Sequence, residues 1–380
     1  MSPLVWSEEQ QLLRETARAF LDAHAPVDAL RQLRDAGDAD GFSRPLWHEM
    51  SRLGWAGIPF AERYGGAGLG WSEVGVLMRE CGRTLAATPM LASCGQGGSL
   101  VELAGSEAQR EAWLPALCAG EALWSAALQE GPHHAPTRVH TRARRVRGGW
   151  RLRGSKHFAL DAHAADFVVV VARTAGEPES PDGLGLFVVE RDAPGFRAER
   201  RCYVDGRGAA DLVLDDVDVA DDAVLGEADG GVPALERTID RSTAMLCAEM
   251  LGGLESAFER TLAYLGVRRQ FGVPIGSFQA LQHRAALMFI EQELCRSVVL
   301  EALHALDGGR DDAAACVSVA KAQLDDAVRL IGNEAVQMHG GIGVTDEADI
   351  GLFLKRFRVQ ERTLGDARYH RDRFAQLGGY

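Results

Sequence analysis

The spacing of apolar positions changes twice along the chain. Apolar side chains recur at helical spacing in residues 1–122, alternate with a period of two in residues 123–230, and return to helical spacing in residues 231–380. The first pattern is typical of amphipathic helices and the second of strands with one buried face. The pattern therefore predicts an α+β protein with an N-terminal helical domain, a middle antiparallel β domain and a C-terminal helical domain.

The helical segments of the first domain are short. Ser7 and Gln10 have the spacing of a capping box, which predicts a helix that begins at Glu8. The apolar stripe of this helix should consist of Leu12, Leu13, Ala17, Phe20 and Leu21. Further periodic segments begin near Pro45, Ser72 and Ser106.

In the middle domain, segments 140–147 and 150–160 flank Gly148-Gly149, which predicts a hairpin turn. Three further apolar segments, ADFVVVVART, GLGLFVVE and ADLVLDDVDV, follow at short spacing. We therefore expect six or seven strands in this domain.

The C-terminal domain has much longer periodic runs. The first extends for over thirty residues after Gly231, and others cover 278–306 and 313–339, with a fourth that starts near Asp346. Long antiparallel helices joined by short links form a bundle, so we expect a four-helix bundle here.

Composition narrows the function. The net charge is -13, which argues against nucleic acid as a general partner because phosphate binding needs a positive face. The longest β-branched run, FVVVVA, is too short to span a membrane, and the N-terminus does not read as a signal peptide. The 7 cysteines have no CxxC spacing, so we expect reduced thiols in a cytoplasmic protein and no metal site.

Two stretches are candidates for phosphate binding. YGGAGLG, Tyr64 to Gly70, contains a GxGxxG-like fragment, but no strand is predicted before it, which favours a surface loop over a dinucleotide site. In RRQFGVPIGSFQALQH, Arg268 to His283, two arginines lie at a helix end and Ser277 is placed to cap the next helix. These arginines either compensate the helix dipole or bind a diphosphate.

The second stretch identifies a family. It resembles the RxQFGxPIxxFQ signature of the acyl-CoA dehydrogenases, and QMHGGIG (337–343) and LGWAGIPFAERYGG (53–66) are similar to two other motifs of that family. Together with CAEMLGG, the stretch is most similar to the bacterial branch that contains the small subunit of pimeloyl-CoA dehydrogenase. The resemblance covers the whole chain and implies the same order of helical domain, β domain and bundle.

The resemblance also implies a cofactor, FAD, in a tetramer in which a neighbouring subunit holds the adenine end. By matched positions, Arg268 should contact the FAD diphosphate, and Phe271 and Gln279 should line the adenosine. Gln337, Gly340 and Gly341 should approach the same diphosphate. Glycine suits this position because it lets the backbone come close to a ligand.

The β domain departs from the family pattern where the flavin ring should lie. A TEPxxGSD-like segment is replaced by QEGPHHAPT, which begins at Gln129 and keeps the glutamate as Glu130. Gln129 and Phe158 are the residues expected at the ring, with Phe158 able to stack on it. Leu160 stands where relatives carry a hydroxyl.

The resemblance implies α,β-dehydrogenation of an acyl-CoA thioester, in which a carboxylate removes the α-proton and the flavin takes a hydride from the β-carbon. In many relatives that carboxylate is the glutamate of a YEGT motif. Here Leu364 occupies its position, followed by Gly365 and Asp366, and Ser242 occupies the alternative position on the first bundle helix. The backbone N–H at position 364, which relatives use to bind the thioester oxygen, is retained.

Other carboxylates are candidate bases. Glu249 lies seven residues after Ser242, hence on the same helix face, although a carboxylate in so apolar a segment is more simply a buried salt bridge. Asp366 lies two residues past the standard position and is placed to cap a short following helix, which Gly365 would separate from the last bundle helix. Asp240 should lie on the wrong side of its helix.

Three functions remain open at this point. The first is a subunit of a heteromeric FAD-dependent acyl-CoA dehydrogenase, whose homologous partner supplies the base and whose electron acceptor is an electron-transferring flavoprotein. The second is a homo-oligomeric flavoenzyme with a displaced base. The third is a non-catalytic protein that binds acyl-CoA or flavin, or that is structural.

Overall fold

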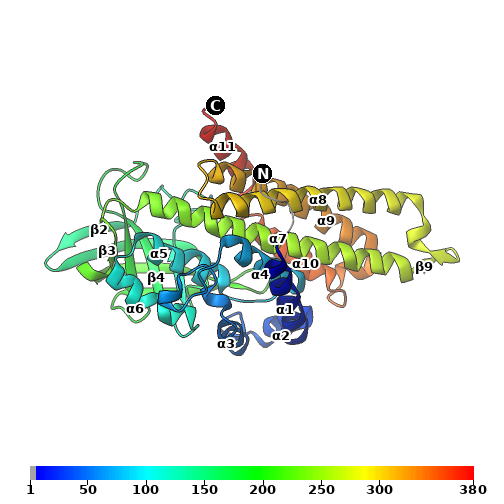
Figure 1. Ribbon diagram of the computed structural model, residues 1–380, viewed down its shortest axis with the longest axis horizontal. Helices are drawn as coiled ribbons and strands as arrows, with labels where there is room; N and C mark the ends of the chain where they lie inside the picture. Colours follow the sequence, from blue (N-terminus) through cyan, green and yellow to red (C-terminus); the bar gives the residue numbers. More distant parts are fainter. Residues whose placement is uncertain (1–5) are drawn as a thin grey trace. The chain divides into compact units, whose positions relative to one another are not determined.

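The computed structural model describes residues 6–380. These residues form two compact units, and Figure 1 shows their helices and strands. The first unit comprises the chain up to Gln32, Trp71–Ala87 and Thr243–Tyr380, and the second comprises Leu33–Gly70 and Thr88–Ser242. The order of helical segments, β segments and long helices agrees with the pattern of apolar residues.

The second unit contains the sheet. Its strands are β1 (Trp124–Ala127), β2 (Arg142–Val146), β3 (Gly149–Leu160), β4 (Phe167–Arg173), β5 (Leu184–Glu190), β6 (Phe196–Cys202), β7 (Gly208–Ala220) and β8 (Val224–Leu225). They lie in the order β6-β7-β3-β2-β4-β5-β8, and β1 pairs with β4. The sheet is antiparallel except that β1 and the first residue of β2, Arg142, pair in parallel with β4.

The predicted number of strands, six or seven, was too small, because the sheet of the described residues has eight. Strands β1 and β8 have only four and two residues, which is too short to show an alternating period. The predicted hairpin is present, but its turn is one residue earlier than expected. Gly149 already pairs with Val146, so the turn consists of Arg147 and Gly148, the latter with a φ of 79°.

Short helices of the second unit include α3 (Arg44–Arg52), a π-helix (Leu91–Gly98), α5 (Ser99–Ala104) and α6 (Glu107–Cys118). The π-helix and α5 were not predicted, because this segment is buried on all sides and shows no amphipathic period. YGGAGLG follows a short 3-10 turn at Glu62–Tyr64 and not a strand, which agrees with the predicted loop.

The helices of the first unit are α1 (Glu8–His24), α2 (Val27–Ala36, which continues into the second unit), α4 (Trp71–Thr84), α7 (Val232–Val267, which begins in the second unit), α8 (Gln279–Asp307), α9 (Ala313–His339), α10 (Ile350–Gln360) and α11 (Ala367–Leu377). In Figure 1 the long helices α7, α8 and α9 run alongside one another, and α10 is much shorter. The predicted bundle is therefore present, although only three of its helices are long.

Details of α1 confirm one prediction and correct another. Ser7 and Gln10 form both bonds of the capping box. The expected apolar stripe is narrower than predicted, because Ala17 and Leu21 are buried whereas Leu12 is 67% exposed. The sequence period places residues on a face, but only packing decides how much of that face is covered.

Helices α4 and α7 pack with their backbones in close contact. A Cβ atom at Gly82 would lie 1.9 Å from the carbonyl oxygen of Glu249, and one at Gly252 would lie 1.8 Å from that of Arg79. Only glycine allows this approach. The contact fixes α7 at the point where Glu249 projects into the first unit. Among residues 6–380, no helix is long and apolar enough to cross a membrane.

Candidate active site

The turn at Leu364 does not have the predicted form. Helix α10 ends at Gln360, so Gly365 does not terminate it as expected, and a turn covers residues 361–364. Leu364 has a φ of 59° and Gly365 a φ of 97°. A leucine in the left-handed region is unusual, since its Cβ is crowded there. The Leu364 side chain is nevertheless buried, with 7% of its surface exposed.

Neighbouring groups hold this turn in place. The carbonyl oxygen of Leu364 lies 2.9 Å from Nε2 of His370, and the carbonyl oxygen of Gly365 accepts a hydrogen bond of 2.8 Å from Nζ of Lys321. A side chain at Gly365 would collide with Tyr369, whose ring carbon lies 2.5 Å from an ideal Cβ. The turn therefore requires glycine at position 365 and is fixed by α9 and α11.

Asp366 caps α11, as predicted. Its carboxylate accepts the backbone N–H of Tyr369 at 3.0 Å and pairs with Arg362 at 2.8 Å. Partial burial acts to raise the pKa of Asp366, but the Tyr369 N–H and the Arg362 charge outweigh it and the pKa is lowered. The carboxylate is thus ionised and engaged with its own helix.

The backbone N–H of Leu364 is a hydrogen-bond donor of this turn that has no acceptor among the described residues. Within residues 6–380 it donates no hydrogen bond, and neither does the N–H of Gly365. A buried N–H group without a partner is rare in folded proteins, because its desolvation is not compensated. The turn therefore presents a donor that suits an oxygen of a ligand.

Glu249 is held in a buried ion pair. Arg356, on α10, donates from Nη2 to both carboxylate oxygens of Glu249, at 2.9 and 3.1 Å, and from Nε at 3.1 Å. The exposed fraction is 1% for Glu249 and 6% for Arg356. This is the salt bridge that the apolar surroundings of Glu249 suggested.

The alternative base position carries a satisfied hydroxyl. Ser242 is buried in the second unit, and its Oγ donates to the carbonyl oxygen of Gly95 at 2.9 Å. Asp240 is also buried, with 7% of its surface exposed. Ser242 has no acidic group and its proton is already committed to a backbone carbonyl.

The first part of the stretch Arg268–His283 forms a hairpin that connects α7 to α8 and projects from the end of these helices (Figure 1). Strands β9 (Arg269–Gln270) and β10 (Val273–Pro274) flank Phe271 and Gly272, whose φ angles of 52° and 82° are those of a tight two-residue turn. Phe271 is 91% exposed. An aromatic ring left this open is a candidate for contact with a ligand or another subunit.

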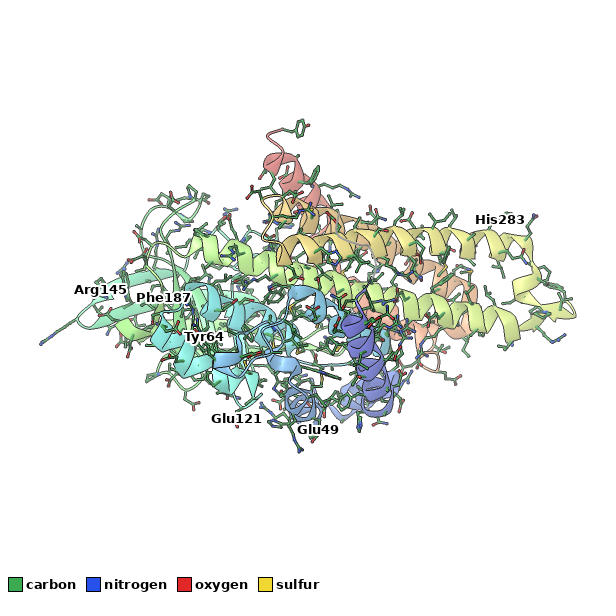
Figure 2. All side chains as sticks on the ribbon, in the orientation of Figure 1. Glu49, Tyr64, Glu121, Arg145, Phe187 and His283 are labelled. Atoms are coloured by element: carbon green, nitrogen blue, oxygen red, sulfur yellow. The ribbon has the colours of Figure 1, made fainter. Side chains whose placement is uncertain are left out.

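Arg268 and Gln279 are exposed at the base of this hairpin. The Arg268 guanidinium makes no hydrogen bond or ion pair within the described chain. The prediction that Ser277 caps α8 was wrong: Phe278 is at the N-cap position, and the Ser277 hydroxyl donates to the carbonyl oxygen of Pro274. His283, one turn further along α8, points outward in Figure 2.

The QMHGGIG stretch, residues 337–343, lies at the same end of the bundle as Arg268. The Tyr264 ring, one turn before Arg268, stacks on that of His339 with centroids 4.5 Å apart. Helix α9 therefore ends beside α7, and Gly340 caps it with a φ of 66°. Gln337 is exposed, and a Cβ at Gly340 or Gly341 would meet no atom within 4 Å. The structure thus brings an unpaired guanidinium and an open stretch of backbone to one end of the first unit.

In the second unit, Phe158 lies at a β-bulge of β3. The register of β3 with β7 shifts between Lys156 and Ala159, and Phe158 has a φ of 56° with 45% of its surface exposed. A bulky residue in this backbone region is strained, and such strain is concentrated at functional sites. The Tyr203 ring lies nearby, 6.5 Å away between centroids.

Gln129 and Glu130 lie beside this bulge. The carbonyl oxygen of Gln129 accepts the N–H of His157 at 2.7 Å, and its side-chain amide donates to Gly131. Glu130 accepts hydrogen bonds from Nζ of Lys156 at 2.7 Å and from the N–H of Thr141 at 3.0 Å. Burial lowers the pKa of Lys156 to about 8, against the charge of Glu130. Glu130 thus anchors the segment structurally.

Leu160, as expected, supplies no hydroxyl. Its carbonyl oxygen accepts a hydrogen bond of 2.6 Å from Oγ of Ser125. That serine hydroxyl is therefore engaged with the backbone.

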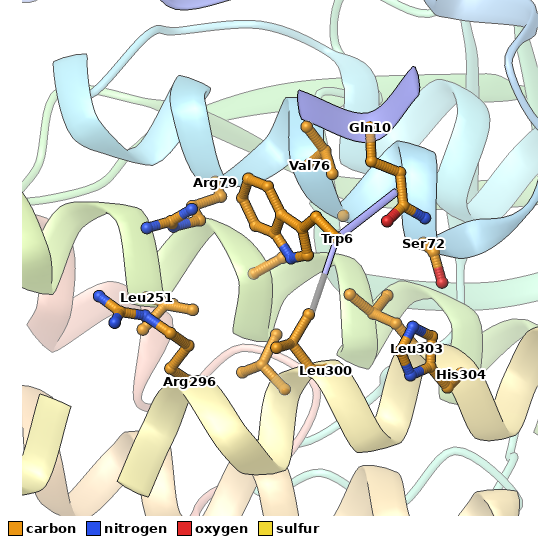
Figure 3. Close-up of a pocket in the computed structure, with 13 residues that line it drawn as sticks. Trp6, Gln10, Ser72, Val76, Arg79, Leu251, Arg296, Leu300, Leu303 and His304 are labelled. Carbon is orange, nitrogen blue, oxygen red and sulfur yellow. The ribbon is translucent and has the colours of Figure 1, made fainter. Parts of the chain in front are cut away.

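Two cavities of the described residues are lined by other side chains. The cavity in Figure 3 has a volume of about 20 Å³, room for about one water, and is closed by Trp6 beside Arg79. A wider hollow of about 980 Å³ in the second unit lies between α6 and the ends of β5 and β7, and none of the predicted site residues lines it. Among residues 6–380 no cluster of metal-ligating side chains was found.

Comparison with known proteins decides the family. Three family models match the chain: the N-terminal domain of acyl-CoA dehydrogenase at residues 7–121, the middle domain at 129–217 and the C-terminal domain at 229–377. The chain belongs to the acyl-CoA dehydrogenase family. Its members are oxidoreductases that bind FAD.

Several relatives match over nearly the whole chain. Isovaleryl-CoA dehydrogenase of Pongo abelii is 30% identical over 96% of this chain and 87% of the relative. A solved structure described as the Tcur3481-Tcur3483 steroid ACAD, in a variant form, is 31% identical with a TM-score of 0.87, covering 98% of both chains. The FAD complex of PigA shares the fold, with 23% identity and a TM-score of 0.89 over 99% of this chain and 98% of that one.

The residues at the end of the bundle fit FAD. Arg268 has an unpaired guanidinium that matches a diphosphate, Gly340 and Gly341 leave the backbone open, and Phe271 offers an exposed ring.

The sequence did not predict Lys321 and His370, which hold the turn at Leu364, or Asp325, which pairs with Lys321. Their signal was weak, since a lysine and an aspartate four residues apart in a helix usually form a solvated pair.

Proposed function

We propose that this acyl-CoA dehydrogenase chain is a FAD-binding subunit that lacks a catalytic base, and that a homologous partner chain supplies it. The observation that carries this proposal is the turn at residues 364–366. Its backbone is held in place, but the residue at the matched position is Leu364, which has no group that can accept a proton.

The two other candidate carboxylates do not replace the missing glutamate. Glu249 would have to give up hydrogen bonds from the buried guanidinium of Arg356, which donates to it three times, before it accepted a proton. Asp366 points its carboxylate at the N-terminus of α11 and at Arg362. The α-proton of a thioester is weakly acidic, so a carboxylate that is already engaged with other groups would be an ineffective base.

The remaining parts of the site are retained in this chain. Arg268, Gln337, Gly340 and Gly341 would hold the FAD diphosphate, with Phe271 and Gln279 near the adenosine. Phe158 and Gln129 would lie at the flavin ring. Bound FAD would supply hydride acceptance from the β-carbon, and the Leu364 N–H would donate to the thioester oxygen.

Apolar side chains are exposed along one face of α8 in the first unit. Helix α8 carries Leu287, Ile290 and Leu294 at helical spacing, and each is between 50% and 57% exposed. A row of half-exposed apolar side chains on one helix is typical of an interaction surface. We infer that it packs against a homologous chain or a second copy, with the tetramer as the complete assembly.

One comparison supports a heteromer, because the name of the steroid ACAD structure joins two designations. The resemblance of CAEMLGG and of the stretch Arg268–His283 to the small subunit of pimeloyl-CoA dehydrogenase favours the same proposal. An electron-transferring flavoprotein would be the acceptor of the electrons. The 7 cysteines are all free thiols, which is in line with a cytoplasmic location.

The test is to purify the chain alone and together with a homologue that carries the glutamate, from the same genome. Flavin absorbance, subunit stoichiometry and anaerobic bleaching by steroid and isovaleryl thioesters are then measured. We expect bleaching by the pair only. Rapid bleaching by the chain alone would overturn the proposal and favour a homo-oligomeric enzyme with a displaced base. A colourless protein in both preparations would favour a non-catalytic homologue.

A further inference from the structure

Lys321 is a buried cation that the proposed chemistry does not use. It lies on α9 with none of its surface exposed, and its Nζ donates to Oδ1 of Asp325 at 2.6 Å and to the carbonyl oxygen of Gly365 at 2.8 Å. The carbonyl oxygen of Glu361 lies 3.5 Å away. Burying an ammonium group is costly unless it is paired and hydrogen-bonded, so this arrangement has to be specified by the surrounding structure.

The contact falls on the turn that carries Leu364. His370, from α11, holds the carbonyl oxygen of Leu364, and Lys321, from α9, holds the next carbonyl oxygen. Two consecutive peptide groups are thereby fixed from two helices. The N–H of Leu364 is left without a partner in the described chain, and its φ remains at 59°.

The groups around Lys321 are otherwise neutral or held elsewhere. Burial raises the pKa of the Cys247 thiol to about 12, so that this neighbour carries no charge. The Glu361 carboxylate pairs with Arg329 and Arg358. Asp325 is therefore the carboxylate that anchors the ammonium group.

We propose that Lys321, anchored by Asp325, is a positioning residue that keeps the Leu364 N–H directed at the thioester oxygen. This inference rests on the proposed function, because it takes the Leu364 turn as the place where the thioester lies. Without the ammonium group, the Gly365 carbonyl loses its buried partner, and Leu364 is free to leave the left-handed region that its side chain disfavours.

The first experiment measures amide hydrogen exchange in the flavin-loaded, full-length protein. Lys321→Met keeps the length of the side chain and removes its charge. Lys355→Met is the control, because it makes the same substitution at a partly exposed lysine of α10 whose nearest carboxylate, Asp346, is 4.0 Å away. We expect amides 362–366 to exchange about tenfold faster in Lys321→Met, beyond any change in global stability, and to be unaffected in Lys355→Met.

Equal exchange of these amides in wild type and Lys321→Met would overturn the proposal. If Lys321→Met does not fold, Asp325→Asn provides the same measurement, since it keeps the side-chain size and weakens the anchor of Lys321. Unchanged exchange at 362–366 in that variant would likewise overturn it.

The second experiment separates positioning from stability. In a Leu364→Glu background, Lys321→Met should lower the rate of flavin reduction about tenfold at saturating thioester, whereas Lys355→Met should leave this rate unchanged. Absence of bleaching in Leu364→Glu itself would count against the proposed function, whereas the exchange experiment would still decide the role of Lys321.

Discussion

The guanidinium of Arg356 binds both carboxylate oxygens of Glu249, and this pair is almost completely buried between α10 and α7. The contact determines the role of Glu249, because a carboxylate held in this way contributes to the fold of the bundle and is not available as a base. It also joins two helices that are about a hundred residues apart in the sequence.

Breaking this pair should destabilise the protein strongly. Arg356→Met leaves Glu249 buried without its charge partner, and we expect the free energy of unfolding to fall by about 3–5 kcal/mol. Denaturant titration of the flavin-loaded protein measures the loss. Arg52→Met is a control, because Arg52 pairs with Glu49 on the exposed surface of α3 and should cost less than about 1 kcal/mol. Similar losses in both variants would contradict the assignment of Glu249 as a structural residue.

Arg268→Ala should lower FAD content and thermal stability together, since bound cofactor stabilises the folded state. The variant removes the unpaired guanidinium at the base of the hairpin. Arg269→Ala, at the adjacent exposed position on β9, is the matched control and should retain its flavin. The ratio of flavin absorbance to protein absorbance gives the result. Full flavin occupancy in Arg268→Ala would show that Arg268 does not bind the cofactor and only compensates the dipole of α7.

Leu364→Glu should restore a carboxylate at the position where relatives carry the base. We expect this variant to bleach its flavin when a suitable thioester is added, whereas Leu364→Gln, of the same shape but without a base, should not. Both residues keep the left-handed backbone, so its strain is unchanged. The loss of a buried leucine should cost about 1–3 kcal/mol. A flavin-loaded Leu364→Glu that never bleaches would point to Leu160 and the altered QEGPHHAPT segment as further defects.

Leu294→Glu should weaken assembly through the exposed face of α8. A charged group would be desolvated in the interface, which we expect to bury more than the roughly 1,600 Å² of standard complexes. Light scattering at micromolar concentration should show a lower mass than for wild type. Leu12→Glu, at an exposed leucine of α1, is the control. A monomeric wild-type protein would rule out the proposed tetramer.

Asp325 should make stability depend on pH. Burial raises its pKa to about 7, more than the Lys321 charge lowers it. Between pH 4 and 7 the folded state therefore binds more protons at this site than the unfolded chain, so its contribution to stability falls as the pH rises through this window. Denaturant titration of wild type and Asp325→Asn from pH 4 to 8 measures the difference. Parallel pH profiles would show that Asp325 is ionised throughout.

The sequence alone determined the architecture and predicted the place of the site. The periodicity of apolar residues predicted the extents of α7, α8 and α9, because long amphipathic helices repeat the same pattern many times. The spacing of Ser7 and Gln10 predicted the start of α1, because a capping box depends only on local hydrogen bonds. The stretches Arg268–His283 and QMHGGIG predict the FAD end through their resemblance to family motifs. Counting along the chain from the second stretch likewise predicts Leu364 at the position of the base.

Tertiary structure alone decided what the buried charges do. Glu249 meets Arg356 across more than a hundred residues, and Lys321 reaches the carbonyl of Gly365 from another helix, so no local pattern records either contact. The same holds for the end of α10 at Gln360, where the apolar period continues to Leu364 but the His370 and Lys321 contacts favour a turn. Local spacing specifies elements, whereas the pairing of buried polar groups depends on which elements pack together, because their desolvation is compensated only by partners from distant segments.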